Sequence, residues 1–179
     1  MSQQQVKKPV TFSADAETDG LHGRPFAIAA AVYDPKGRMI VSFCKRSNVA
    51  VQNPWVKENV LPTLQDIEVA GGYIDLLKEF ADFYNAMREQ YDVTVLWHMG
   101  HVVEAFLFRE LVRHKLIGEF DGPYTPIEVA EHLRMRGFAP DSVDNYARQH
   151  NIQLPEGSTH NPMYDCIVAY EVYRHLNKL

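Results

Sequence analysis

Two carboxylates near the N-terminus could hold a divalent cation. Asp15 and Glu17 are two positions apart at the end of a β-type run over residues 10–16. Side chains at i and i+2 of a strand lie on the same face, so both carboxylates would project together and repel each other unless a cation lies between them. Oxygen ligands of this type suit Mg²⁺ or Mn²⁺ better than zinc. The pair therefore predicts a metal site.

A histidine and an aspartate near the C-terminus extend this pattern. Asn161 and Pro162 are good N-cap and first-helix residues, which predicts a helix with Asp165 in its first turn. A carboxylate at the head of a buried stripe needs a partner, and a metal ion would supply one. His160 lies in the loop just before, and an imidazole titrates near neutral pH, which suits a general base. The stripe that Asp165 heads consists of Val168, Ala169, Val172 and Leu176.

Each motif alone has a second interpretation. Isolated acids and lone histidines in loops are usually solvated surface residues. The run from Asp15 to Gly20 also looks like the start of a calcium-binding EF-hand loop. That loop needs Glu at its twelfth position, which here is Phe26, and it needs a preceding helix, whereas residues 10–13 are typical of a strand. The EF-hand is therefore the weaker interpretation.

Hydrophobic periodicity predicts the elements that must position these motifs. Three strands come first, over residues 10–16, 26–33 and 38–44, and a helix then ends near residue 90. The predicted buried face of that helix consists of Ile74, Leu77, Ala81 and Tyr84. Next come a strand over 93–97, a helix over 101–115, a segment over 127–135 that fits either state, a short helix capped by Asp141, and the C-terminal helix. This order predicts an α/β fold whose mixed sheet has three antiparallel strands, then parallel ones, flanked by helices.

Length and composition fit one folded unit. With 179 residues, of which 46% are hydrophobic and 23% charged, the chain can bury a core without disulfides. We predict a flexible N-terminal segment over residues 1–9 and a single domain over 10–179. The sequence has no apolar run that would span a membrane and no secretory signal, so we expect a cytoplasmic protein. The net charge of −5 disfavours nucleic-acid binding, but two divalent cations would bring it to −1.

Taken together, the two motifs resemble the first and third motifs of the DEDDh 3′-5′ exonucleases. The matching residues are Asp15, Glu17 and Gly20-Leu21 at one end and His160-x4-Asp165 at the other, and the resemblance runs from residue 12 to residue 176. That family includes polymerase proofreading subunits and small exoribonucleases such as ribonuclease T and oligoribonuclease. The resemblance implies a ribonuclease H-like fold and a single exonuclease domain.

The resemblance also implies roles for individual residues. Two divalent metal ions, Mg²⁺ or Mn²⁺, would be held by Asp15, Glu17 and Asp165, and His160 would take the proton of the attacking water. The substrate would be the 3′ end of single-stranded RNA or DNA, released as nucleoside 5′-monophosphates. The backbone near Thr18 and the side chain of Leu21 would meet the terminal nucleotide. Small members of the family often pair, so a homodimer is expected.

The middle motif departs from the family's pattern. The family usually has His-Asn-Ala-x-Phe-Asp at a helix start, whereas here His98 is followed six positions later by Glu104. We predict Glu104 as the third metal-site carboxylate in chain order, with a spacing one residue longer and a side chain one methylene longer than the family's aspartate. Glu104 could instead be a helix-surface residue, and His98 with His101 could bind zinc. A further alternative is a nucleic-acid-binding protein of the same fold that has lost catalysis.

Overall fold

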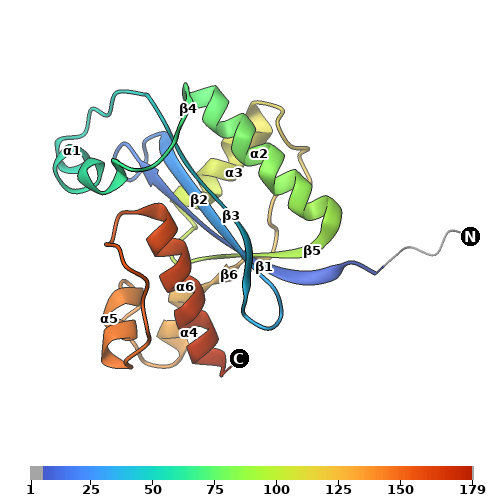
Figure 1. Ribbon diagram of the computed structural model, residues 1–179, viewed down its shortest axis with the longest axis vertical. Coiled ribbons are helices and arrows are strands. Elements are labelled where there is room, and N and C mark those ends of the chain that lie inside the picture. Colours follow the sequence, from blue (N-terminus) through green and yellow to red (C-terminus); the bar gives the residue numbers. More distant parts are fainter. Residues whose placement is uncertain (1–5, 179) are drawn as a thin grey trace, which may run out of the picture.

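A six-stranded mixed sheet forms the centre of the computed structural model, which describes residues 6–178 (Figure 1). The strand order is β4-β3-β2-β1-β5-β6. β1, β2 and β3 are antiparallel neighbours, while β4, β5 and β6 each join their neighbour in parallel. This is the predicted α/β fold. The strands are β1 (Lys8–Thr18), β2 (Pro25–Tyr33), β3 (Met39–Ser47), β4 (Val69–Gly71), β5 (Tyr91–Trp97) and β6 (Ile127–Glu128).

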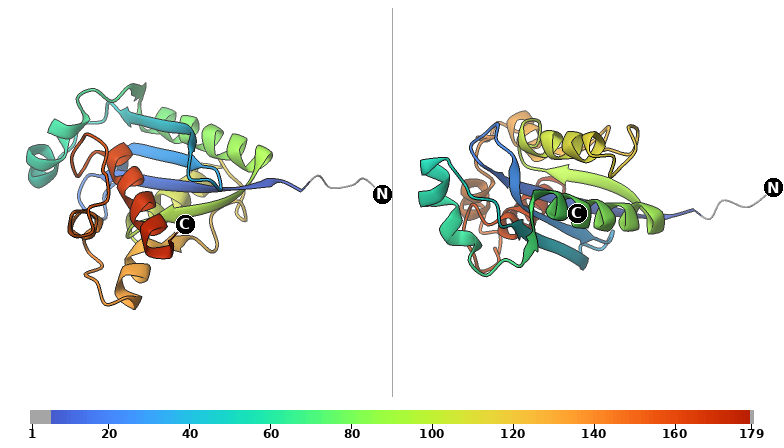
Figure 2. Two further views of the ribbon diagram at one scale, coloured as in Figure 1. Left: turned by 60° about the horizontal axis from the view of Figure 1, so that its bottom comes forward. Right: turned by 90° about the horizontal axis from the view of Figure 1, so that it is seen from above.

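Helices cover both faces of the sheet (Figure 2). One face carries α2 (Tyr73–Gln90) and α3 (Val103–Arg113), and the other carries α4 (Val129–Met135), α5 (Val143–Gln149) and α6 (Pro162–Asn177). Within residues 6–178, none of these helices combines the length and the apolar character that crossing a membrane requires.

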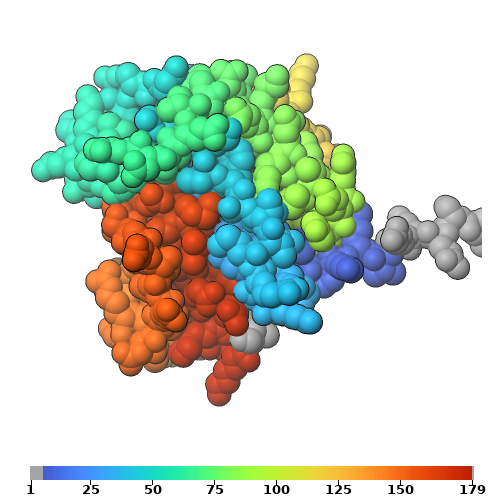
Figure 3. Space-filling view, in the orientation of Figure 1, coloured from blue at the N-terminus to red at the C-terminus, as the bar shows by residue number. Residues whose placement is uncertain are grey.

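A short segment after β3 reaches the start of α6. It consists of α1 (Pro54–Asn59) and the 3₁₀ turn η1 (Leu61–Leu64), which pack on the beginning of β2. Figure 3 shows this segment, in teal, directly beside the red and orange C-terminal part of the chain. The Asn161 side chain donates a hydrogen bond of 3.0 Å to the carbonyl of Thr63 across this contact.

Burial along the strands explains the layering. All nine residues of β2 are buried, as expected for a central strand that is covered on both faces. In β1 the side chains of Phe12, Ala14 and Ala16 pack with α2 and α3. Asp15 pairs with Ala29, which packs in the core on the α6 side. The odd-numbered side chains of β1 therefore face α6.

Several element boundaries differ from the predictions. β1 begins at Lys8, so residues 8 and 9 lie in the sheet, and the rest of the predicted flexible segment over 1–9 falls largely on residues 1–5, outside the described residues. Ser142 caps α5 instead of Asp141, because its hydroxyl accepts from the backbone N–H of Asn145. Ile74 is 42% exposed, since the buried face of α2 begins at Leu76. The ambiguous segment 127–135 divides into β6 and α4, and the sequence did not predict α1, η1 or β4.

Candidate active site

Three carboxylates from opposite ends of the chain meet at one end of the sheet. Asp15 and Glu17 come from β1 and Asp165 from the first turn of α6, and one ligand oxygen of each lies within 4.8 Å of the other two. The strand alternation places both β1 side chains toward α6, as the sequence predicts. Among residues 6–178, these three side chains are the one set of His, Cys, Asp or Glu residues spaced closely enough to hold a metal ion.

The start of α6 fixes the position of Asp165. The side chain of Asn161 accepts hydrogen bonds from Met163 N and Tyr164 N, and Pro162 occupies the first turn, so the helix begins where the sequence predicts. An oxygen of Asp165 then accepts from the backbone N–H of His160 at 2.9 Å. The helix start therefore orders the carboxylate and the preceding histidine together.

Burial disfavours the ionised form of these carboxylates when no cation is bound to them. It raises the pKa of Asp15 well above its usual range, and neighbouring acids raise it further. It also raises the pKa of Glu17 to about 8 and that of Asp165 to about 7. A divalent cation would remove this repulsion, and an all-oxygen donor set suits Mg²⁺ or Mn²⁺. The residues present therefore fit the metal that the sequence predicts.

Glu104 is buried beside the cluster. It lies in the first turn of α3 with 5% of its surface exposed, and its Oε1 accepts a hydrogen bond of 3.0 Å from Ala16 N, between Asp15 and Glu17. Burial raises the pKa of Glu104 to about 7. The helix-surface interpretation of Glu104 is therefore wrong. Glu104 lines the same cavity of about 420 Å³ as the three clustered carboxylates, although it is not a member of their close group.

His160 stands at the rim of this cavity in an unusual backbone conformation. Its φ angle is +69°, in the left-handed region that residues with a Cβ rarely adopt. The backbone N–H of His160 donates to Asp165, and its carbonyl accepts from the hydroxyl of Thr63 at 2.6 Å. The His160 ring lies edge-on to the Trp55 ring, with the ring centres 5.2 Å apart. Its Nδ1 is 3.9 Å from Glu17 Oε1, and 42% of the side chain is exposed. The imidazole thus faces both the carboxylates and solvent.

The two other metal interpretations do not fit. Asp19 accepts hydrogen bonds from the backbone N–H groups of Gln52 and Asn53, and a strand precedes the loop, so the EF-hand interpretation is wrong. His98 Nε2 is 2.8 Å from the carbonyl oxygen of Pro140, and burial lowers the pKa of its imidazole. Among the residues that the structure describes, no metal-like group includes His98 or His101.

A second cavity of about 390 Å³ adjoins the carboxylates. It holds both residues predicted to meet a terminal nucleotide, the buried Thr18 and Leu21, whose side chain is 64% exposed. The opposite wall consists of Trp55, Val56 and Val60 from the α1 segment, an element that was not predicted from the sequence. The signal was available, because Asn53-Pro54 is an N-cap and first-turn pair like Asn161-Pro162.

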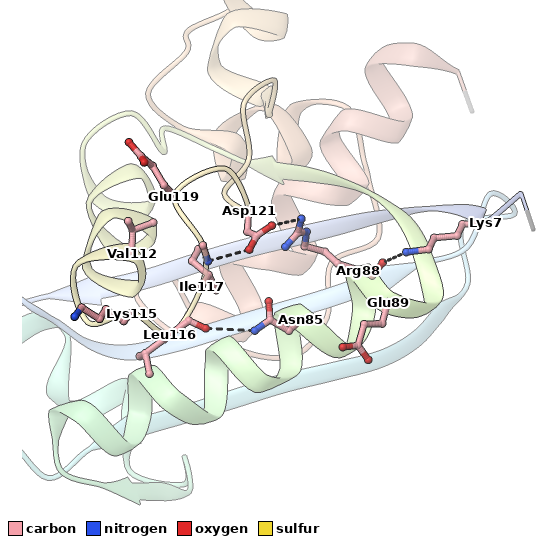
Figure 4. A pocket seen from close by; sticks show the side chains of 11 residues that line it. Lys7, Asn85, Arg88, Glu89, Val112, Lys115, Leu116, Ile117, Glu119 and Asp121 are labelled. Atoms are coloured by element: carbon pink, nitrogen blue, oxygen red, sulfur yellow. Dashed lines mark hydrogen bonds and ion pairs between the residues drawn. The ribbon is translucent and has the colours of Figure 1, made fainter. Parts of the chain in front are cut away.

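A larger cavity, of about 860 Å³, lies at the opposite end of the sheet, before the start of β1 (Figure 4). Three basic and three acidic side chains line it, so its formal charges balance. Arg88 pairs with Asp121 at 2.9 Å, and Lys7 donates to the carbonyl of Arg88. It contains none of the predicted site residues, so size alone does not mark the functional site here.

Comparisons with known proteins agree on the fold. No family model matches the sequence, and no curated protein matches it. Solved structures do. The nuclease domain of 3′hExo, a DEDDh family member bound to rAMP, has a TM-score of 0.66 and 11% identity over 98% of this chain and 95% of that one. Exonuclease X in complex with 5′ overhanging duplex DNA has a TM-score of 0.56 and 16% identity over 95% and 91%.

A third structure is longer than this chain. E. coli exonuclease I in complex with a dT13 oligonucleotide has a TM-score of 0.66 and 12% identity over 95% of this chain, which spans 41% of exonuclease I. At these identities the likeness shows the fold, and the predicted ribonuclease H-like architecture is confirmed. The function has to be argued from the site.

Proposed function

We propose that the chain is a metal-dependent 3′-5′ exonuclease of the DEDDh type. It would hydrolyse terminal phosphodiesters of single-stranded RNA or DNA to nucleoside 5′-monophosphates. The observation that carries this proposal is the close group of Asp15, Glu17 and Asp165 with the His160 ring 3.9 Å from Glu17. The nuclease structures that share the fold, one bound to rAMP and one to an oligonucleotide, support the substrate class.

In the proposed mechanism the carboxylates would hold two divalent ions. Asp15, Glu17 and Asp165 would be the ligands, with Glu104 as the remaining candidate carboxylate, and bound ions would stabilise negative charge on the phosphate and the leaving oxygen. His160 accepts the proton of the attacking water, and its exposed side chain can pass that proton to solvent. Glu17 stabilises the imidazolium that forms, because it lies beside Nδ1.

The adjoining cavity explains why the reaction would occur at an end. A terminal nucleoside fits between Leu21 and Trp55, with the backbone near Thr18 at its sugar. Aromatic faces hold bases of single strands without reading their sequence. In this proposal the wall formed by α1 blocks the path of the strand beyond its 3′ nucleotide.

A binding protein of the same fold is the second candidate, and the altered middle motif favours it. Incubation of the protein with a 5′-labelled oligonucleotide and Mn²⁺ separates the two. Stepwise shortening from the 3′ end supports the exonuclease, whereas binding without shortening supports the second candidate. Asp15→Asn should abolish the shortening. Asp82→Asn, on the exposed side of α2, is the matched control and should not alter it.

A homodimer, expected from the resemblance, remains a prediction. Light scattering coupled to size-exclusion chromatography measures the mass directly, and 20.5 kDa is the mass of one chain.

A further inference from the structure

A second polar cavity opens at the active end of the sheet, on the α2 and α3 face. It has a volume of about 350 Å³ and lies between the start of α2, the end of α3 and the start of β2. We call it the Tyr73 pocket. The lining residues that matter here are Arg24, Tyr73, Glu110, Arg113 and His114.

The buried carboxylate of Glu110 contacts three of the side chains that line this pocket. The side chain of Glu110 is only 5% exposed. Its Oε2 accepts from the Tyr73 hydroxyl at 2.8 Å, and its Oε1 lies 3.3 Å from an Arg113 nitrogen. His114 Nε2 is 3.7 Å from the same carboxylate. Glu110 therefore holds three side chains in place and does not itself reach the surface.

Two arginines and one aspartate reach the exposed part of the Tyr73 pocket, and the carboxylate of that residue, Asp75, already accepts from Gly72 N at 2.8 Å. The Arg113 side chain is 75% exposed, whereas the acid that it pairs with is covered. The Arg24 guanidinium lies 5.4 Å from the centre of the Tyr73 ring, and no carboxylate of residues 6–178 forms an ion pair with it. Guanidinium groups bind phosphate oxygens in a two-pronged geometry. The rim of the Tyr73 pocket therefore carries two exposed arginines against the one exposed carboxylate of Asp75, on a chain of net charge −5.

The Tyr73 pocket is connected to the candidate active site through two elements. Arg24 closes the β1–β2 turn that carries Leu21, because its carbonyl accepts from Asp19 N at 3.2 Å. On α3, Glu110 follows Glu104 by six residues, which is about 9 Å of helix rise. At about 3.4 Å per nucleotide of a stacked strand, this distance corresponds to roughly three nucleotides.

We propose that the Tyr73 pocket binds a backbone phosphate of the substrate strand, roughly three nucleotides to the 5′ side of the bond that is cleaved. This inference rests on the proposed exonuclease function. Arg24 and Arg113 bind the phosphate, and Tyr73 and Glu110 hold the arginines in position. The contact is independent of base identity, so it gives affinity and a minimum substrate length without sequence preference.

The test compares substrate lengths in a double variant, Arg24→Gln with Arg113→Gln. We expect the ratio of kcat/KM for a ten-nucleotide strand to kcat/KM for a dinucleotide to fall about tenfold relative to the wild type. Arg109→Gln is the matched control, because Arg109 lies on the same helix but stacks on Phe106 outside the Tyr73 pocket. An unchanged ratio in the double variant overturns the proposal.

A binding measurement separates this inference from the proposed function. Fluorescence anisotropy of a labelled ten-nucleotide strand is recorded with Ca²⁺ in place of Mn²⁺, with inorganic phosphate as competitor. We expect the double variant to bind about tenfold more weakly, with the slope of log K against log salt reduced by about 1 to 2. If the wild type also fails to shorten the strand in Mn²⁺, this difference in binding still supports the Tyr73 pocket, while the exonuclease proposal fails. Equal binding by both proteins, or a pocket that takes inorganic phosphate and not the strand, contradicts the inference.

Discussion

Replacing Glu17 with glutamine is expected to stabilise the metal-free protein at pH 8. Burial, together with the charges of Asp165 and Glu104, raises the pKa of Glu17 from 4.5 to about 8. This folded-state pKa lies above the unfolded one. The part of the free energy of unfolding that depends on protonated Glu17 is therefore fully present below pH 4.5 and is lost as the pH rises to about 8. Glutamine has no charge to bury, so the variant does not lose this stability.

The size of the effect follows from the shift. One pKa unit corresponds to about 1.4 kcal/mol, so a rise from 4.5 to about 8 amounts to roughly 5 kcal/mol at pH 8. The repulsion is shared with the neighbouring acids, and one substitution relieves only part of it, on the order of 2 kcal/mol. For a chain of 179 residues this corresponds to a rise in melting temperature of about 4–8 °C.

Differential scanning fluorimetry in EDTA at pH 5 and pH 8 measures this difference. We expect a clear gain at pH 8 and a much smaller one at pH 5. Excess Mn²⁺ is expected to reverse the order, because a cation bound to the native cluster stabilises the wild type more. Glu58→Gln, exposed on α1, is the control and should change neither value. A lower melting temperature for Glu17→Gln in EDTA at pH 8, or equal stabilisation of both proteins by Mn²⁺, would refute the reasoning.

Three further predictions concern the chemistry. His160→Gln should lower kcat by about 10²–10⁴-fold with little change in Mn²⁺ affinity, measured on a labelled oligonucleotide; a loss below tenfold would contradict its role as the base. Thr63→Val, which removes the hydrogen bond to the His160 carbonyl, should lower kcat about tenfold at nearly constant KM, and Thr63→Ser should restore it. Glu104→Gln should weaken Mn²⁺ binding about 10–100-fold in a metal titration, and unchanged binding would leave Glu104 with only its bond to Ala16.

Local patterns were enough to predict the main elements and the acidic cluster. The alternation of β1 fixes the face of Asp15 and Glu17, and the cap at Asn161 fixes the turn that presents Asp165. Both signals depend on neighbours within a few residues. The fold then brings the two ends of the chain together through the pairing of β1 with β2 and the packing of α6 on them.

Features that depend on distant contacts could not be predicted. A helical stripe does not show whether Glu104 turns inward, because the deciding partner is the backbone of Ala16, 88 positions away. β4 has only three residues and exists because β3 lies beside it. The hydrogen bond from Thr63 to His160 joins residues 97 positions apart, and neither residue type indicates it.

The division of the acidic cluster between β1 and α6 has a consequence for protein synthesis. A nascent chain that has left the ribosome only as far as α5 carries Asp15 and Glu17 but lacks Asp165 and the imidazole that precedes it. If the chain is a nuclease, it cannot hydrolyse its own transcript while α6 is still inside the ribosome, because α6 completes the site.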